Sequence, residues 1–184
     1  MKKQAKPLQL KYRKLYPDVS DLSFGSEESA CFDLRAYLAK SIERVEGYSV
    51  DSMKITVGVA STLGGGGVGS RAVVIHPGQR IMIPTGLIFD IPVGYSVRVH
   101  ARSGLALKAG LVMANSEGVI DSDYTDETKI IVLNVSNIPI KINHGDRIAQ
   151  AELVPVLTYD LVSTDETINQ KTSRAGGFGS TGVS

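Results

Sequence analysis

Short runs rich in Val and Ile, separated by turn residues, dominate the chain from residue 71 onward. These runs cover residues 72–75, 80–83, 86–91, 95–99, 129–135, 138–142 and 147–156. Pro and Gly stand between them, as in His76-Pro77-Gly78 and Pro92-Val93-Gly94, and such residues mark tight turns. Strands this short and this regularly spaced are typical of a sandwich or a barrel. The sequence therefore predicts an all-β fold.

Length and composition limit what such a chain does. With 184 residues, 42% hydrophobic and 21% charged, it has the size and composition of one globular domain. A net charge of +1 argues against stable binding to nucleic acid or to an acidic membrane. The apolar runs are far shorter than the ~20 residues that cross a bilayer, and the basic amino terminus lacks the apolar core of a secretion signal. We expect an intracellular, soluble protein.

Two segments depart from the strand pattern. Residues 37–70 interrupt it and contain the run Gly64-Gly65-Gly66-Gly67, which is costly to hold in one conformation. We expect a surface insertion with a hairpin near 55–59; the alternative is an element that binds a protein partner, since loops often carry function. Residues 164–184 are polar and then glycine-rich, which predicts a mobile arm. The expected organisation is a domain over 1–163 with an insertion at about 37–70, followed by this arm.

The candidate metal ligands and nucleophiles are few. The three histidines, His76, His100 and His144, lie far apart without metal-ligand spacing, so we expect them to be surface or structural residues. The single cysteine, Cys31, cannot form an internal disulfide. No pattern for a neighbouring base supports its activation, so we expect a small buried hydrophobe.

Five segments carry polar groups that strand packing does not explain: residues 30–34 (ACFDL), 101–106 (ARSGLA), 118–124 (GVIDSDY), 145–150 (GDRIAQ) and 174–182 (RAGGFGSTG). Their guanidinium, amide and hydroxyl donors suit a polyphosphate. An aromatic residue on the arm suits stacking on a base, and carboxylates suit Mg²⁺ or the activation of a water. The residues indicate a nucleoside polyphosphate site with hydrolytic chemistry, without naming the base. One pair, Asp146 and Arg147, is at least as well explained by a salt bridge within a turn.

In order and content, these five segments resemble the five motifs of the trimeric dUTPases. The resemblance extends from about the first strand to the carboxyl terminus, apart from the insertion. It implies a jelly-roll-like (β-clip) fold and a homotrimer with active sites at subunit interfaces. It also implies Mg²⁺-dependent hydrolysis of dUTP to dUMP and pyrophosphate, which limits uracil in DNA and supplies dUMP for dTMP synthesis.

The resemblance also implies roles for individual residues. Asp121 would be the general base that activates a water for attack on the α-phosphorus, and Tyr124 would pack against the deoxyribose and exclude a 2′-hydroxyl. The uracil pocket would be lined by Asn115, Val119, Ile120 and Lys129. The phosphate chain would contact Arg102, Ser103, Gly104 and Gln150, and Asp33 would hold Mg²⁺ through a water. In the arm, Arg174 would reach the γ-phosphate, Phe178 would stack on uracil, and Gly179, Ser180 and Thr181 would close over the phosphates.

The chain departs from the family pattern at several positions. Cys31-Phe32 stands before Asp33 where Gly-Tyr is usual, Ala101 replaces a common Pro, Asp126 stands where a Gly is usual, and Arg174 lies one residue closer to Phe178 than in the commonest pattern. None of these changes removes a group that the chemistry needs. Two alternatives remain: a dCTP deaminase on the same fold, and a nucleotide-gated regulatory or partner-binding protein. The segment 121–124 and the arm favour the hydrolase.

Overall fold

The computed structural model describes residues 8–39, 41–62 and 70–173. Within these ranges the chain forms strands and one short helix, which confirms the all-β prediction. The strands are β1 (Lys11–Lys14), β2 (Phe32–Arg35), β3 (Arg44–Tyr48), β4 (Lys54–Gly58), β5 (Ala60–Thr62), β6 (Ser70–Ile75), β7 (Arg80–Pro84), β8 (Leu87–Asp90), β9 (Tyr95–His100), β10 (Leu111–Met113), β11 (Gly118–Ile120), β12 (Lys129–Asn134), β13 (Ile140–Asn143) and β14 (Arg147–Pro155). The helix α1 (Ser103–Ala109) follows β9.

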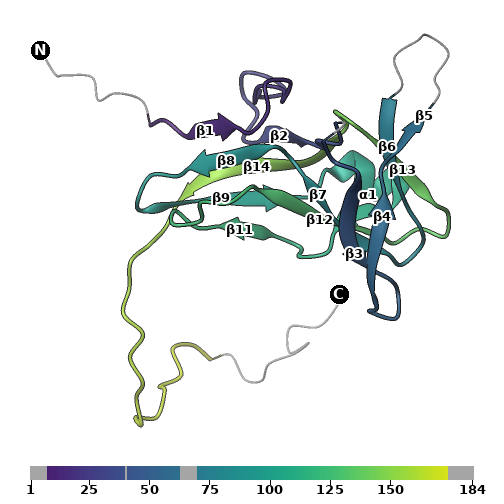
Figure 1. The fold of residues 1–184 in the computed structure, drawn as a ribbon. Coiled ribbons are helices and arrows are strands. Elements are labelled where there is room, and N and C mark those ends of the chain that lie inside the picture. Colours follow the sequence, from purple (N-terminus) through teal and green to yellow (C-terminus); the bar gives the residue numbers. More distant parts are fainter. Residues whose placement is uncertain (1–7, 40, 63–69, 174–184) are drawn as a thin grey trace, which may run out of the picture.

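The strands pair in antiparallel fashion in four sheets (Figure 1). A five-stranded sheet has the order β10-β12-β7-β3-β4, and a four-stranded sheet has the order β11-β9-β14-β2. Two smaller sheets have the orders β13-β6-β5 and β1-β8. The four-stranded sheet carries β2, β11 and β14, which include parts of three of the five polar segments of the sequence.

The core follows from the alternation of side chains along each strand. In the paired strands β7 and β12, the residues Ile81, Ile83, Ile130 and Val132 are almost completely buried. They belong to one hydrophobic cluster with Leu34 and Val97 of the four-stranded sheet. Each such aliphatic side chain stabilises the fold by about 1.5–3 kcal/mol. The apolar positions of the sequence therefore fix which face of each strand turns inward.

The segment 37–70 is joined to the core more closely than a surface loop would be. β3 and β4 form the hairpin expected near 55–59, and β3 also pairs with β7, where Gly47 lies opposite Ile81. A Cβ atom at Gly47 would collide with the backbone oxygen of Arg80, so glycine permits this close approach. The hairpin thus extends the five-stranded sheet. The glycine run 64–67 lies outside the described residues.

The helix α1 was not predicted from the sequence. It has seven residues, none of them fully buried, and within it Leu105 alone packs against the hydrophobic core, which is too little for an apolar stripe with a period of 3.6. It ends at Gly110, whose φ of 69° is left-handed and whose N–H donates to the carbonyl of Leu105. In a helix this short, the residues at the ends determine where the helix forms more than an apolar face does.

After β14 the chain leaves the sheets as an extended segment (Figure 1). From residue 156 to 173 this segment lacks regular secondary structure, and it exposes Leu157, Tyr159 and Leu161 by 83%, 75% and 91%. Among the described residues, no helix is long and apolar enough to cross a bilayer.

Candidate functional site

A cluster of charged side chains forms where β2, β14 and the start of α1 meet. The Asp33 carboxylate accepts a hydrogen bond from Arg147 Nη1 at 3.0 Å and contacts Arg102 Nε at 3.2 Å. Arg102 Nη1 also donates to the carbonyl of Arg147 at 3.1 Å. The Asp33 side chain is only 13% exposed, whereas the arginines are 26% and 46% exposed. We call Asp33, Arg102, Arg147 and Gln150 the Asp33 cluster.

Strand pairing brings this cluster together from distant parts of the sequence. Gln150 on β14 lies opposite Asp33 on one side and opposite His100 on the other. Its side-chain Nε2 donates to the carbonyl of Ala101 at 3.3 Å, next to Arg102. Ser103 and Gly104 follow as the exposed first residues of α1, and open space surrounds the Cα of Gly104. The cluster therefore presents two guanidinium groups beside an accessible helix start.

One expectation about this cluster is wrong. The sequence explained Asp146 and Arg147 at least as well by a salt bridge within their turn as by a role in the site. Instead, the Asp146 carboxylate accepts hydrogen bonds from the backbone and side-chain nitrogens of Asn143, and Arg147 reaches across the sheet to Asp33. A turn carboxylate commonly bonds the backbone nearby, which leaves the arginine to the longer-range partner.

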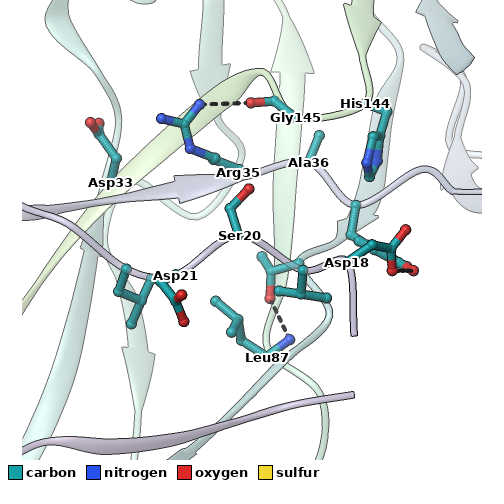
Figure 2. A pocket seen from close by; sticks show the side chains of 13 residues that line it. Asp18, Ser20, Asp21, Asp33, Arg35, Ala36, Leu87, His144 and Gly145 are labelled. Atoms are coloured by element: carbon teal, nitrogen blue, oxygen red, sulfur yellow. Dashed lines mark hydrogen bonds between the residues drawn. The ribbon is translucent and has the colours of Figure 1, made fainter. Parts of the chain in front are cut away.

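Asp33 also lines a cleft, together with Asp18, Arg35 and His144 (Figure 2). Arg35 Nη1 donates to the carbonyl of Gly145 at 2.9 Å, and the hydroxyl of Tyr37 donates to Asp18 at 2.7 Å. Burial, followed by the bond to Asp18, raises the pKa of Tyr37 to about 12. The backbone N–H of Leu38 donates to Nδ1 of His144, which confirms His144 as a structural residue. These contacts hold the strands that carry the cluster.

A second group of residues lines an open cavity of about 450 Å³, which we call the hairpin pocket. Six of the residues predicted on the base and sugar side of the site line it: Asn115, Val119, Ile120, Asp121, Tyr124 and Lys129. Its other walls include Met82, Val99 and Met113, which the sequence analysis did not single out. Because side chains along a strand alternate between its two faces, the sequence indicates the face on which each lies. It does not indicate which of them border a cavity.

The chain from β11 to β12 shapes the mouth of this pocket. The backbone N–H of Tyr124 donates to the carbonyl of Asp121 at 3.2 Å, and the Tyr124 hydroxyl donates to the carbonyl of Glu127 at 3.1 Å. Burial, and then the charges of Asp126 and Glu127, raise the pKa of Tyr124. Asp121 itself is exposed. The pocket thus combines apolar walls with an accessible carboxylate and a neutral phenol at its rim.

Asp121, at the rim of the hairpin pocket, and Arg102 of the Asp33 cluster lie toward opposite ends of β9. In the pairing of β11 with β9, Ile120 lies opposite Val97, so Asp121 is near the beginning of β9. Arg102 follows the other end of that strand. At about 3.3 Å per extended residue, Asp121 and Arg102 of one chain are roughly 20 Å apart. The arm residues Arg174, Phe178, Gly179, Ser180 and Thr181 lie outside the described residues.

Comparisons with known proteins agree with this architecture. The phage phi11 dUTPase of S. aureus superimposes with a TM-score of 0.63 at 20% identity, covering 87% of this chain and 98% of that one. The Staphylococcus bacteriophage 80alpha dUTPase with dUPNHPP gives a TM-score of 0.69 at 21% identity over 95% and 99%. The fold is therefore the jelly-roll-like, all-β fold of these structures.

Sequence similarity identifies the family. The dUTPase family model matches residues 68–182. The deoxyuridine 5′-triphosphate nucleotidohydrolase of Bdellovibrio bacteriovorus is 42% identical over 150 residues, covering 79% of this chain and 97% of that protein. The one from Nautilia profundicola is 46% identical over 110 residues, covering 60% and 77%. The chain belongs to the dUTPase family.

Proposed function

We propose that this protein hydrolyses dUTP to dUMP and pyrophosphate. The observation that carries the proposal is the division of the polar residues into two groups, each suited to one part of the nucleotide. The hairpin pocket offers Asn115 and the edge strand β11 for hydrogen bonds to a base, beside apolar walls. The Asp33 cluster offers Arg102 and the start of α1 to the phosphates, because guanidinium and amide groups match phosphate oxygens.

In this reaction Asp121 accepts a proton from a water, whose oxygen attacks the α-phosphorus. The bond between the α-phosphorus and the bridging oxygen breaks, and pyrophosphate leaves with the electron pair. Arg102, with Ser103, Gly104 and Gln150, binds the phosphates and stabilises the negative charge on the leaving group. Tyr124 packs against the deoxyribose and leaves no room for a 2′-hydroxyl. Asn115, Val119, Ile120 and Lys129 surround the uracil.

Asp33 fits a Mg²⁺ ion only through a water. Arg102 and Arg147 already occupy one position on each of its two oxygens, but a carboxylate has about four lone-pair sites. The remaining sites would accept a hydrogen bond from a metal-bound water. When bound, Mg²⁺ would neutralise phosphate charge. Arg174, Phe178, Gly179, Ser180 and Thr181 of the arm would then cover the nucleotide, with Phe178 over the uracil.

We further propose that the active sites lie between the subunits of a homotrimer. Asp121 and Arg102 must both lie within a few ångströms of the reacting phosphates, yet register puts them roughly 20 Å apart in one chain. A second copy that brings its hairpin pocket to the Asp33 cluster of the first resolves this conflict. The exposed Leu157, Tyr159 and Leu161 of the extended segment are suited to cover a neighbouring subunit.

The first experiment measures pyrophosphate release from dUTP with Mg²⁺, with UTP, dTTP and dCTP in parallel. Rapid turnover of dUTP alone is the expected result. Ammonia release from dCTP would instead identify a deaminase. Binding of dUTP without turnover would favour a nucleotide-gated regulatory protein.

The shared site is tested by mixing two inactive variants, Asp121→Asn and Arg102→Ala. Each alone should be inactive, because every site of a uniform trimer lacks one group. After denaturation and joint refolding, mixed trimers regain activity at the sites that combine an intact Asp121 with an intact Arg102. Mixed trimers that form but stay inactive would contradict the shared site, and a monomer in light scattering would contradict the trimer.

A second candidate function concerns the hairpin of β3 and β4 in the segment 37–70. Its turn exposes Val50 and Met53 by 75% and 65%, and apolar side chains gathered at an exposed turn suit a protein partner. Deleting residues 49–53 between the strands and replacing them with a short polar turn should leave dUTP turnover unchanged and remove co-purifying partners. Unchanged partners would reject this role.

A further inference from the structure

Three side chains that are far apart in the sequence converge on the four-stranded sheet. Cys31 precedes β2, Glu152 lies on β14, and His100 ends β9. The Cys31 Sγ, a His100 ring nitrogen and a Glu152 carboxylate oxygen all lie within 4.8 Å of one another. His100 Nε2 is 3.2 Å from Glu152 Oε1. The three ligand atoms therefore face a common point.

Strand register explains why they meet. Ala151 on β14 pairs with Phe32 on β2, and Gln150 pairs with His100 on β9. Glu152 therefore lies beside Cys31 on one side and diagonal to His100 on the other, on the face that turns away from the core. The three side chains are each half-buried. Neighbouring strands hold them, so little backbone movement is needed to bring the ligand atoms together.

The spacing suits a four-coordinate divalent cation. Bond lengths of about 2.0–2.3 Å at tetrahedral angles separate neighbouring ligand atoms by roughly 3.3–3.8 Å. The His100–Glu152 distance of 3.2 Å is already close to this range. Rotation of the side chains within the 4.8 Å limit brings in the thiol. The donor set of sulfur, imidazole nitrogen and carboxylate oxygen is one that Zn²⁺ accepts and Mg²⁺ does not.

A second carboxylate stands behind the histidine. Glu117 Oε1 lies 3.9 Å from His100 Nδ1, and Arg98 Nη1 holds the other Glu117 oxygen at 3.1 Å. A carboxylate on the far nitrogen of a metal-binding histidine fixes the tautomer and directs the opposite lone pair toward the metal. Glu117 is on the Nδ1 side of His100 and would take this role if it moved into hydrogen-bond distance, which leaves Nε2, 3.2 Å from Glu152 Oε1, as the nitrogen for a metal.

We propose that Cys31, His100 and Glu152 bind a thiolate-accepting divalent cation, with Zn²⁺ as the preferred ion and a fourth position open to water. This site is separate from the nucleotide site. On the same face of the sheet, Asp33 and Gln150 lie two residues away from Cys31 and Glu152 along their strands. Cys31, His100 and Glu152 take no part in the proposed hydrolysis. The inference therefore stands whether or not the protein hydrolyses dUTP.

The test uses the full chain, stripped with a chelator and kept reduced with a non-thiol phosphine, and titrated with Co²⁺. Because Cys31 is the only cysteine, a thiolate-to-Co²⁺ charge-transfer band in the near ultraviolet reports on this residue alone. We expect one Co²⁺ per subunit with that band, displaced by one equivalent of Zn²⁺ and unaffected by excess Mg²⁺.

Variants separate the site from adventitious binding. Cys31→Ser should abolish the band, Glu152→Gln should weaken Zn²⁺ binding at least tenfold, and Glu117→Gln should weaken it about tenfold through the histidine. His76→Gln is the matched control, because His76 is an exposed histidine elsewhere on the molecule, and it should change nothing. Co²⁺ binding without a thiolate band, or Zn²⁺ affinity unchanged in Glu152→Gln, would overturn the proposal.

Discussion

The Asp33 cluster and the hairpin pocket are built in opposite ways. The cluster is a set of charged side chains from three parts of the sequence, held to one another by ion pairs at 3.0 and 3.2 Å. The pocket is an open cavity of about 450 Å³ whose predicted residues come from one stretch between 115 and 129. The charged groups of the Asp33 cluster are bound to one another within the chain, whereas the hairpin pocket is open to a ligand.

This difference is consistent with the proposal that the two regions bind different parts of one nucleotide. Charged groups that must meet a highly charged ligand keep their geometry only if other groups hold them. A pocket for a base and a sugar needs shape and a few hydrogen bonds, which a local hairpin supplies. The roughly 20 Å between Asp121 and Arg102 in one chain is the reason for our proposal that each site is shared between two subunits.

The largest effect is expected at the mouth of the hairpin pocket. Asp121→Asn removes the proton acceptor but keeps the shape of the side chain, so turnover of dUTP should fall by about 10²–10⁴-fold. The affinity for dUTP should change little. Asp123→Asn, at an equally exposed aspartate two residues away, is the control. Full activity in Asp121→Asn would reject the assignment of the base.

A smaller effect on rate, but a change in selectivity, is expected from Tyr124→Ala. Removing the ring opens space beside the sugar, so the preference for dUTP over UTP should fall by about 10–100-fold. The measurement is kcat/KM for both nucleotides. Tyr48→Ala is a matched control, because Tyr48 and Tyr124 are 43% and 42% exposed. An unchanged ratio would mean that another group excludes the 2′-hydroxyl.

On the side of the Asp33 cluster, Gly110→Ala tests the end of α1. Gly110 has a φ of 69°, and a Cβ there would lie 2.9 Å from the Cβ of Ser136. We expect a loss of about 2–4 kcal/mol in the free energy of unfolding. Gly94→Ala separates the two causes, since Gly94 has a φ of 85° but open space around it, and should cost about 1 kcal/mol. Equal losses would show that the contact with Ser136 does not matter.

Asp33→Asn tests the ion pairs that close the cluster. It leaves two guanidinium groups without their shared carboxylate, so the free energy of unfolding should fall by about 1–3 kcal/mol. Asp90→Asn is the comparison, because the Asp90–Lys11 pair is 3.9 Å long and both side chains are about three-quarters exposed. That variant should show no measurable change in denaturant unfolding. Equal effects would mean that burial of Asp33 adds nothing.

The smallest effect concerns Tyr37, which lines the same cleft as Asp33. Its pKa is raised to about 12 in the folded chain, while an unfolded tyrosine titrates near 10. Between pH 10 and 12 the unfolded state has lost this proton and the folded state has not, so the free energy of unfolding falls as pH rises. Tyr37→Phe should make this fall shallower, and parallel profiles for the two proteins would contradict the assignment.

Local sequence was sufficient for most of the strands, and the motif resemblance named the polar residues that line the hairpin pocket. The predicted runs at 80–83, 95–99 and 129–135 became β7, β9 and β12 with ends shifted by a residue, because alternation and turn residues are properties of neighbouring positions. Asn115, Asp121, Tyr124 and Lys129 line one cavity because they are near one another along the chain. The motif resemblance named Asp33, Arg102 and Gln150, which strand pairing then brought together.

Other features required the pairing of distant strands. Arg147 reaches Asp33 instead of Asp146 because β14 lies beside β2 with a register shift between Arg147 and Ala149. His100 and Cys31, judged separately in the sequence, meet at Glu152 for the same reason. The segment 37–70 pairs with β7 at Gly47, and α1 forms without an apolar stripe that the sequence could show. A one-residue change of register would turn these side chains to the other face, and no local pattern records it.

By itself, then, the sequence determined most of the strands and which of their side chains turn to the core, because these depend on residues close together in the chain. Only the tertiary structure decided which charged groups form ion pairs, that Cys31 and His100 meet at Glu152, and how far Asp121 lies from Arg102. Those depend on the register between strands up to 120 residues apart, which is set by the packing of the whole core.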